Sequence, residues 1–266
     1  MGSGRWPGLR MWRGRRDLDK RLGARLAVAA VAAFLIAVPF TLLLVLVQSS
    51  WPPLRRLDEG TADRLHSYAL GHPAAVRLFR DWSTIFGPST WRLLVALLAI
   101  WLLYRRAVRL AIWAIITITV GGLLGVTLKF VVNRARPILV DPVASASGSS
   151  FPSLHSMNAA LGVGVLVLAA LPVLGARWRA GVWALGVLIV LITGYTRIAL
   201  GVHWVSDVLA GWTLGAGVVA GTAAAFESWR REAGRVPVAP AREGVEPEAA
   251  TDITPGPAPA VRRGRH

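Results

Sequence analysis

The feature that most constrains this chain is a run of residues without any charged side chain, residues 27–47. As a helix rising 1.5 Å per residue, this run is about 30 Å long, the thickness of a bilayer core. The apolar region of a signal peptide is shorter, about 7–15 residues, and ends at a small-residue cleavage site. The sequence therefore predicts a retained membrane anchor. Five further apolar segments follow, at residues 91–104, 111–132, 156–174, 181–195 and 204–226.

The composition agrees with six membrane spans. Of the 266 residues, 54% are hydrophobic and only 17% are charged, whereas soluble domains average about 25% charged residues. Lys and Arg nevertheless outnumber Asp and Glu by 30 to 14, and they flank the apolar segments instead of forming one stripe. This pattern predicts an all-α, six-transmembrane-helix integral membrane bundle and argues against a nucleic-acid partner. The chain has no cysteine, so disulfides and Cys-ligated metals are excluded.

The polarity of the chain divides it into three parts. Residues 1–26 form a basic N-terminal tail, residues 27–228 the six-span domain, and residues 229–266 a Pro/Ala/Glu/Arg-rich tail that we expect to be disordered. Between the first and second spans, Pro and Gly residues break residues 48–90 into short pieces. The spacing of apolar residues there predicts amphipathic helices near the membrane interface.

Basic residues near the span ends predict the orientation. They gather before the first span, between the second and third, between the fourth and fifth, and after the sixth, and with six spans all four places lie on one side. The positive-inside rule predicts that this side is cytoplasmic and that both termini lie there. The expected location is the cell (plasma) membrane. The loops after the first, third and fifth spans then face outward. The basic residues are Arg5, Arg10, Arg13, Arg15, Arg16, Lys20, Arg21, Arg25, Arg105, Arg106, Arg109, Arg177, Arg179, Arg230, Arg231 and Arg235.

Two polar groups lie at the outward ends of the third and fourth spans. Lys129 and Arg136 are seven residues apart, so they share a face if the helix continues, and a lysine in an apolar span favours a polar cavity or an anionic partner. Ser153 and His155 open the fourth span, where free backbone N–H groups can bind phosphate. Each group also has a structural interpretation: Lys129 can extend to the headgroups, and His155 can be an interfacial residue of a capped helix.

A third polar group lies at the start of the sixth span. His203 and Asp207 are four residues apart on one helix face, so the carboxylate can hold the imidazole in one tautomer. Arg197 precedes them and can bind an anion in bidentate fashion. A local structural hydrogen bond is the alternative for the His–Asp pair. All three groups map to one side of the membrane, and together they fit phosphoryl transfer without a metal: cationic clamps, a nucleophile and an acid.

These residues resemble the three-part signature of the type 2 phosphatidic acid phosphatase (PAP2) superfamily of membrane lipid phosphatases. Its pattern K-x6-R-P matches in full, P-S-G-H matches except for Leu154 in place of glycine, and S-R-x5-H-x3-D matches with Thr196 in place of serine. The resemblance implies that His203 attacks phosphorus, that Asp207 orients His203, and that His155 protonates the leaving oxygen and then activates water. It further implies that the phosphate oxygens are held by Lys129, Arg136, Ser153 and Arg197, with no metal and no other cofactor.

The resemblance predicts an enzyme that hydrolyses a lipid phosphomonoester or pyrophosphate through a phosphohistidine intermediate. The favoured substrate is undecaprenyl pyrophosphate, followed by phosphatidic acid and phosphatidylglycerol phosphate, and membrane lipids are the expected partners. Two alternatives stay open: a catalytically silent protein that binds lipid headgroups or takes part in transport, and a lipid phosphotransferase. Leu154 is the one feature that favours the silent alternative, because glycine would allow a closer approach of the backbone or a positive φ. No feature of the sequence indicates an oligomeric state.

Overall fold

The computed structural model describes residues 37–254, and every regular element in this part of the chain is helical. A helix over Ala37–Gln48 is followed by α2 (Pro52–Gly71), α3 (Pro73–Ile85), α4 (Pro88–Tyr104), α5 (Val108–Val132), α6 (Leu154–Ala170), α7 (Ala176–Ala199) and α8 (Val205–Glu232). Short elements complete the list: η1 (Leu171–Val173), α9 (Pro240–Glu243), η2 (Pro247–Ala249) and α10 (Ala250–Ile253). The all-α membrane bundle expected from the sequence is confirmed.

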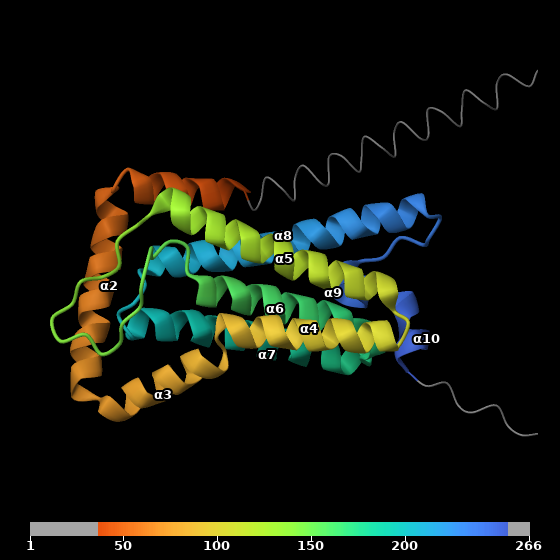
Figure 1. Ribbon diagram of the computed structural model, residues 1–266, viewed down its shortest axis with the longest axis horizontal. Helices are drawn as coiled ribbons and strands as arrows, with labels where there is room; N and C mark the ends of the chain where they lie inside the picture. Colours follow the sequence, from red (N-terminus) through yellow and green to blue (C-terminus); the bar gives the residue numbers. More distant parts are fainter. Residues whose placement is uncertain (1–36, 255–266) are drawn as a thin grey trace, which may run out of the picture.

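Within residues 37–254, five helical stretches are long and apolar enough to cross a membrane. Pro73–Tyr104 counts as one of them, and the other four contain α5 to α8. A sixth arises if Ala37–Gln48 and α2, which meet at a bend of 84°, form one broken span. The start of the predicted first span, residues 27–36, and the predicted N-terminal tail lie outside the described residues. In Figure 1, α4 to α8 run along the long axis, whereas α2 crosses one end of the bundle.

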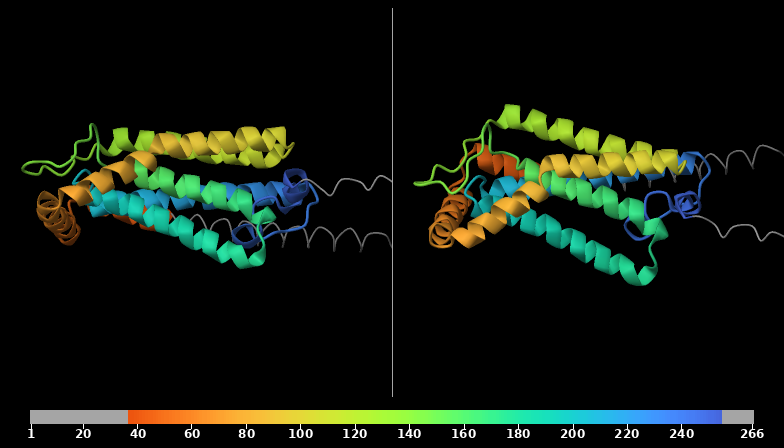
Figure 2. Two further views of the ribbon diagram at one scale, coloured as in Figure 1. Left: turned by 90° about the horizontal axis from the view of Figure 1, so that it is seen from below. Right: turned by 60° about the horizontal axis from the view of Figure 1, so that its bottom comes forward.

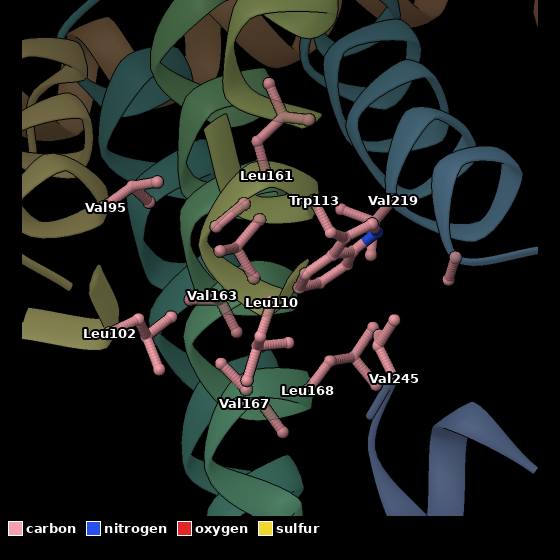
Figure 3. Packing of buried hydrophobic residues seen from close by; sticks show 14 of the residues in the cluster. Val95, Leu102, Leu110, Trp113, Leu161, Val163, Val167, Leu168, Val219 and Val245 are labelled. Carbon is pink, nitrogen blue, oxygen red and sulfur yellow. The ribbon is translucent and has the colours of Figure 1, made fainter. Parts of the chain in front are cut away.

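Helix α6 forms the centre of the bundle, with α4, α5, α7 and α8 packed around it (Figure 2). Its side chains meet those of α4 and α5 in the main hydrophobic cluster, where Leu161 and Trp113 are fully buried or nearly so (Figure 3). Helix α8 approaches α6 most closely, because Gly211 and Gly215 face the α6 backbone without a side chain between. Small residues at such contacts are typical of membrane bundles, where close packing drives association.

The interfacial helices predicted for residues 48–90 correspond to α2 and α3. The buried face of α2 differs from the apolar face expected from the sequence, because it includes Asp58 and His66 while Tyr68 is exposed. His66 fixes the long loop that follows α5, since its Nε2 lies 2.5 Å from the carbonyl oxygen of Val140. Helix α2 therefore packs on polar groups at one end of the bundle.

The prediction that residues 229–266 form a disordered tail is wrong for residues 229–254, and residues 255–266 lie outside the described part. Helix α8 continues to Glu232, and the segment after it folds back over the end of the bundle opposite α2 (Figure 1). Val245, Ala249 and Ile253 are buried in the main hydrophobic cluster. The buried Arg230 donates to the Val245 carbonyl at 3.0 Å and pairs with Glu248 at 2.6 Å. Few, widely spaced apolar residues fix this segment, which is why its composition looked disordered.

Candidate active site

The structure brings all seven sequence-predicted site residues to the end of the bundle that α2 crosses. They come from the last turn of α5, the loop over residues 133–153, the start of α6, the end of α7, the turn before α8 and the first turn of α8. In this order they are Lys129, Arg136, Ser153 and His155, Arg197, His203 and Asp207. The three motifs are in contact, because Nη1 of Arg136 lies 3.2 Å from Nε2 of His203 and the N–H of Ser153 donates to the carbonyl of Asp207.

The loop over residues 133–153 is closed at its base, and this closure places its arginines. Helix α5 ends at Asn133, which adopts a left-handed conformation with φ 44°. The chain then runs back alongside itself: the N–H of Ser150 donates to the Arg134 carbonyl at 2.8 Å, and the Ser150 hydroxyl to the Ala135 carbonyl at 3.0 Å. Lys129 and Arg136 therefore do not share a continuous helix, as the sequence had allowed, but meet because the loop turns back.

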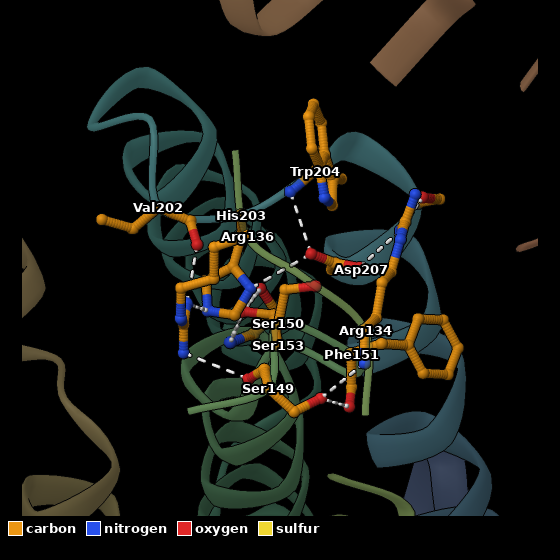
Figure 4. A network of polar contacts seen from close by, with 12 residues as sticks. Arg134, Arg136, Ser149, Ser150, Phe151, Ser153, Val202, His203, Trp204 and Asp207 are labelled. Atoms are coloured by element: carbon orange, nitrogen blue, oxygen red, sulfur yellow. Dashed lines mark hydrogen bonds and ion pairs between the residues drawn. The ribbon is translucent and has the colours of Figure 1, made fainter. Parts of the chain in front are cut away.

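Lys129 and Arg136 are held by backbone carbonyls around the site. Lys129 donates to the carbonyl of Ser149. The guanidinium of Arg136 donates to the carbonyls of Gly148 at 3.0 Å and Val202 at 2.6 Å, and Ser149 is also within reach at 3.2 Å. Figure 4 shows Arg136 between this loop and the turn that carries His203. Two cationic groups are thus fixed side by side, since both can donate to the Ser149 carbonyl.

The contacts of His203 define its tautomer. Its Nδ1 lies 3.4 Å from Oδ2 of Asp207, and its Nε2 lies 3.2 Å from Nη1 of Arg136 (Figure 4). Because a guanidinium can only donate, Nε2 is the acceptor nitrogen and Nδ1 carries the proton toward the carboxylate. The lone pair of Nε2 therefore points toward the cationic groups, which is the arrangement a nucleophile needs.

The protonation of His203 follows from its burial, since its side chain is 2% exposed. Burial lowers the pKa of His203 to about 4, and the positive charges of Arg197 and Arg136 act in the same direction. The hydrogen bond and the negative charge of Asp207 oppose this shift but do not cancel it. The imidazole is therefore neutral near pH 7, and its Nε2 carries a lone pair and no proton.

Helix α6 begins at the site and directs its N-terminus toward it. Ser153 is fully buried and caps this helix, with its hydroxyl 3.5 Å from the N–H of Ser156, and its own N–H donates to the carbonyl of Asp207 at 3.0 Å. His155 lies in the first turn and is half-buried. The start of α6 is thus tied directly to the start of α8.

Leu154 does not distort this turn, although a glycine was expected there. It is the first residue of α6 and is not among the residues with positive φ. Its side chain packs toward Gly125 of α5, where a Cβ would lie 2.8 Å from Cδ2 of Leu154. Gly125 therefore provides the room that the larger side chain requires, and the backbone of the site keeps a regular helical start.

Arg197 is 8% exposed at the end of α7, and its guanidinium is held by α3. Its Nη1 donates to the hydroxyl of Ser83, whereas its buried Nε has no hydrogen-bond partner. A buried donor without a partner is costly, so it indicates a position where an anion can bind. Ser83 gave no signal in the sequence.

Sequence reasoning also missed the groups behind Asp207. Oδ1 of Asp207 accepts from Nη1 of Arg134 at 2.6 Å, and Oδ2 accepts from the N–H of Trp204 at 2.9 Å. Nη2 of the same guanidinium lies 2.8 Å from Oδ2 of Asp58 in α2. The one available signal was a second arginine in NRARP, two residues before Arg136. In the structure the two arginines have different partners: carboxylates for Arg134 and mainly backbone carbonyls for Arg136.

Fold and site together define an all-α membrane protein with a cationic, histidine-centred site at one end of the bundle. Residues 110–231 match the model of the PAP2 superfamily. This part of the chain therefore matches the PAP2 superfamily, and the resemblance predicted from its motifs is confirmed.

Individual relatives agree with this assignment. An undecaprenyl-diphosphatase of Sulfolobus acidocaldarius is 30% identical over 122 residues, which are 44% of this chain and 55% of that protein. Phosphatidylglycerophosphatase B of Bacillus subtilis is 40% identical over 96 residues, 35% of this chain and 46% of that protein. The chain spans about half the length of these curated relatives.

The fold has a solved counterpart. The crystal structure of a transmembrane PAP2 type phosphatidylglycerolphosphate phosphatase from Bacillus subtilis superposes with a TM-score of 0.64 at 22% identity. The match covers 73% of this chain and 96% of that chain. At this identity the likeness shows the fold.

Proposed function

We propose that this chain hydrolyses a lipid phosphomonoester or pyrophosphate through a phosphohistidine intermediate, without a metal ion. The observation that carries the proposal is the state of His203: a neutral imidazole whose Nδ1 proton points to Asp207 and whose Nε2 lone pair points to the cationic groups. The match of residues 110–231 to the PAP2 superfamily and the phosphatase names of the two relatives support the same reaction class.

The proposed reaction has two steps. In the first, Nε2 of His203 attacks phosphorus, the bond from phosphorus to the leaving oxygen breaks, and His155 gives that oxygen a proton. Asp207 stabilises the positive charge that the imidazole acquires. In the second, His155 takes a proton from water, the water oxygen attacks phosphorus, and the P–N bond breaks to release inorganic phosphate. The phosphate oxygens are held throughout by Lys129, Arg136, Ser153 and Arg197.

A groove in the apolar part of the bundle supports a lipid substrate. It measures about 1420 Å³ and lies between α6, α7, α8 and the segment over residues 234–241, with charged side chains only at the end away from the site. Its lining includes Leu191 and Trp212, which are within two helical turns of Arg197 and Asp207 respectively. A chain attached to a phosphate at the site could follow this groove between the helices. Undecaprenyl pyrophosphate is the favoured substrate, with phosphatidylglycerol phosphate and phosphatidic acid next.

The proposal is tested with purified protein in detergent and excess chelator. We expect inorganic phosphate to be released from at least one of the three lipid phosphates. His203→Ala should abolish release, because the nucleophile is lost, whereas the matched variant His72→Ala, at an exposed histidine between α2 and α3, should keep it. Full activity of His203→Ala would refute the histidine mechanism.

The two alternatives give different results in the same assay. A silent headgroup-binding protein releases phosphate from none of the three lipids. A phosphotransferase releases little phosphate in water but transfers the phosphoryl group when an alcohol is added. When the reaction with phosphate-labelled substrate is stopped without acid, the parent protein should carry the labelled phosphoryl group. The His203→Ala variant should carry none.

We further propose that the site faces outward and that both termini are cytoplasmic. The distribution of basic residues supports this orientation, and the chain's lack of cysteine makes it easy to test. Ile138, 95% exposed beside the site, and Val236, 73% exposed near the opposite end, can each be replaced by Cys. An impermeant maleimide should label Ile138→Cys in intact cells and Val236→Cys only after lysis. The reverse pattern would overturn the orientation.

A further inference from the structure

Helix α2 carries a buried carboxylate, Asp58, that no sequence motif explains. Its side chain is 1% exposed. Oδ1 accepts from the backbone N–H of Ser206 at 2.9 Å, and Oδ2 accepts from the Ser206 hydroxyl at 2.5 Å and from Nη2 of Arg134 at 2.8 Å. A buried charge needs such partners, but these partners lie directly beside Asp207.

Arg134 connects this carboxylate to the one that holds His203. Its Nη1 lies 2.6 Å from Oδ1 of Asp207 and 2.7 Å from the Ser206 hydroxyl. One planar guanidinium therefore joins two carboxylates, and its rigid geometry fixes the angle between them. Because Arg134 occupies Oδ1 of Asp207, Oδ2 is left for the N–H of Trp204 and for Nδ1 of His203 (Figure 4).

The geometry points to Asp58 and Arg134 as positioning residues for the nucleophile. We infer that Asp58 sets the orientation of Arg134, that Arg134 sets the Asp207 carboxylate, and that Asp207 keeps His203 in the Nδ1-protonated tautomer. The inference rests on the proposed function, because it assigns the pair a role in the same reaction. If Asp58 only anchored α2, its loss would lower stability and leave the state of His203 unchanged.

The test uses Asp58→Asn, which keeps the shape of the side chain but removes its charge. The amide has one acceptor oxygen where the carboxylate has two, so it cannot accept from both Arg134 and the N–H of Ser206, and the guanidinium loses the charge that holds it. We expect kcat to fall about 10- to 100-fold with little change in KM, the usual effect of a small misplacement of a reacting group. The ¹⁵N resonances of His203 in the free protein should change from one tautomer to a mixture.

The matched control is Asp63→Asn, at an exposed aspartate of the same helix. It should match the parent protein in kcat and in the resonances of His203. A double variant, Asp58→Asn with Arg134→Gln, should be no slower than Arg134→Gln alone, because two residues acting as one unit are not additive.

The inference would be overturned if Asp58→Asn kept the parent kcat and the parent tautomer of His203. A lower unfolding temperature with no change in kcat or tautomer would overturn it equally. If this variant does not fold, Ser206→Ala replaces it. It removes one hydrogen bond of Asp58 and one of Arg134 but leaves the charges, so we expect a smaller fall in kcat with the same tautomer change. Parent behaviour would refute the inference. If the parent releases no phosphate from any lipid, the proposed function fails, whereas the resonances of His203 still decide the positioning role.

Discussion

A methyl group added to Gly211 tests whether the contact between α6 and α8 sets the geometry of the site. A Cβ at Gly211 would lie 2.6 Å from the carbonyl oxygen of Ser153 and 3.2 Å from the backbone nitrogen of Met157. Ordinary contact begins near 3.4 Å, so the helices must separate by about 0.8 Å. Backbone atoms cannot move aside as a side chain can, so α8 must carry Asp207 away from Ser153.

The magnitude follows from two opposing terms. Overpacking costs about 1–3 kcal/mol, and alanine is better than glycine in a helix by about 1 kcal/mol, so the net loss of stability is small. A displacement of about 1 Å at reacting groups can slow catalysis on the order of 10²-fold. Gly211→Ala should therefore fold and lose most of its activity.

The assay is phosphate release from the best lipid substrate, with thermal unfolding in detergent as the stability measurement. Gly221→Ala is the matched control, because it lies in the same helix and nothing is within 4 Å of its added methyl group. It should keep full activity and be slightly more stable. Parent activity in Gly211→Ala would show that this contact does not set the geometry, and equal losses in both variants would show a general effect on α8.

Three further predictions concern other parts of the molecule. Because burial lowers the pKa of His203 to about 4, its NMR titration should show a neutral ring from pH 6.5 down to about pH 4. The stability that the neutral ring contributes should be complete above pH 6.5 and lost as the pH falls toward 4. A titration midpoint near pH 6.5 would contradict this. Ala220→Phe fills the groove and should raise KM for a long-chain lipid phosphate but not for a short soluble one, whereas equal changes for both would argue against a tail in the groove. Arg230→Met removes the guanidinium that bonds to Glu248 and to the Val245 carbonyl. The free energy of unfolding should fall by about 1–3 kcal/mol, and residues 233–254 should become accessible to protease. Protease resistance equal to that of the parent would show that the contact contributes little.

The sequence was informative about the site wherever short-range spacing carries the geometry. His203 and Asp207 are four residues apart, so they share a helix face in any fold that keeps the helix start. Ser153 and His155 open α6 because Pro152 precedes an apolar run. Leu154 could not be interpreted in this way, because the room for its side chain is provided by Gly125 on another helix.

The supporting contacts could not be predicted, because they join distant parts of the chain. Asp58 bonds to Ser206 across 148 residues, and Arg197 bonds to Ser83 across 114. Neither α2 nor α3 has a motif, and a polar residue of an interfacial helix normally faces water. The packed segment after Glu232 was missed for the same reason, since its few apolar residues are recognisable only against the end of the bundle.

Taken alone, the amino-acid sequence determined that this chain is a helical membrane protein, and it predicted seven site residues that the structure brings to one end of the bundle. Hydropathy and helical spacing are local properties, and a long apolar run in a bilayer forms a helix because its backbone groups must bond to one another. Only the tertiary structure decided which groups hold those side chains: α2 and α3 supply Asp58 and Ser83, and the returning loop supplies Arg134. These contacts form only where helix packing brings buried charged groups together, so they depend on the whole fold.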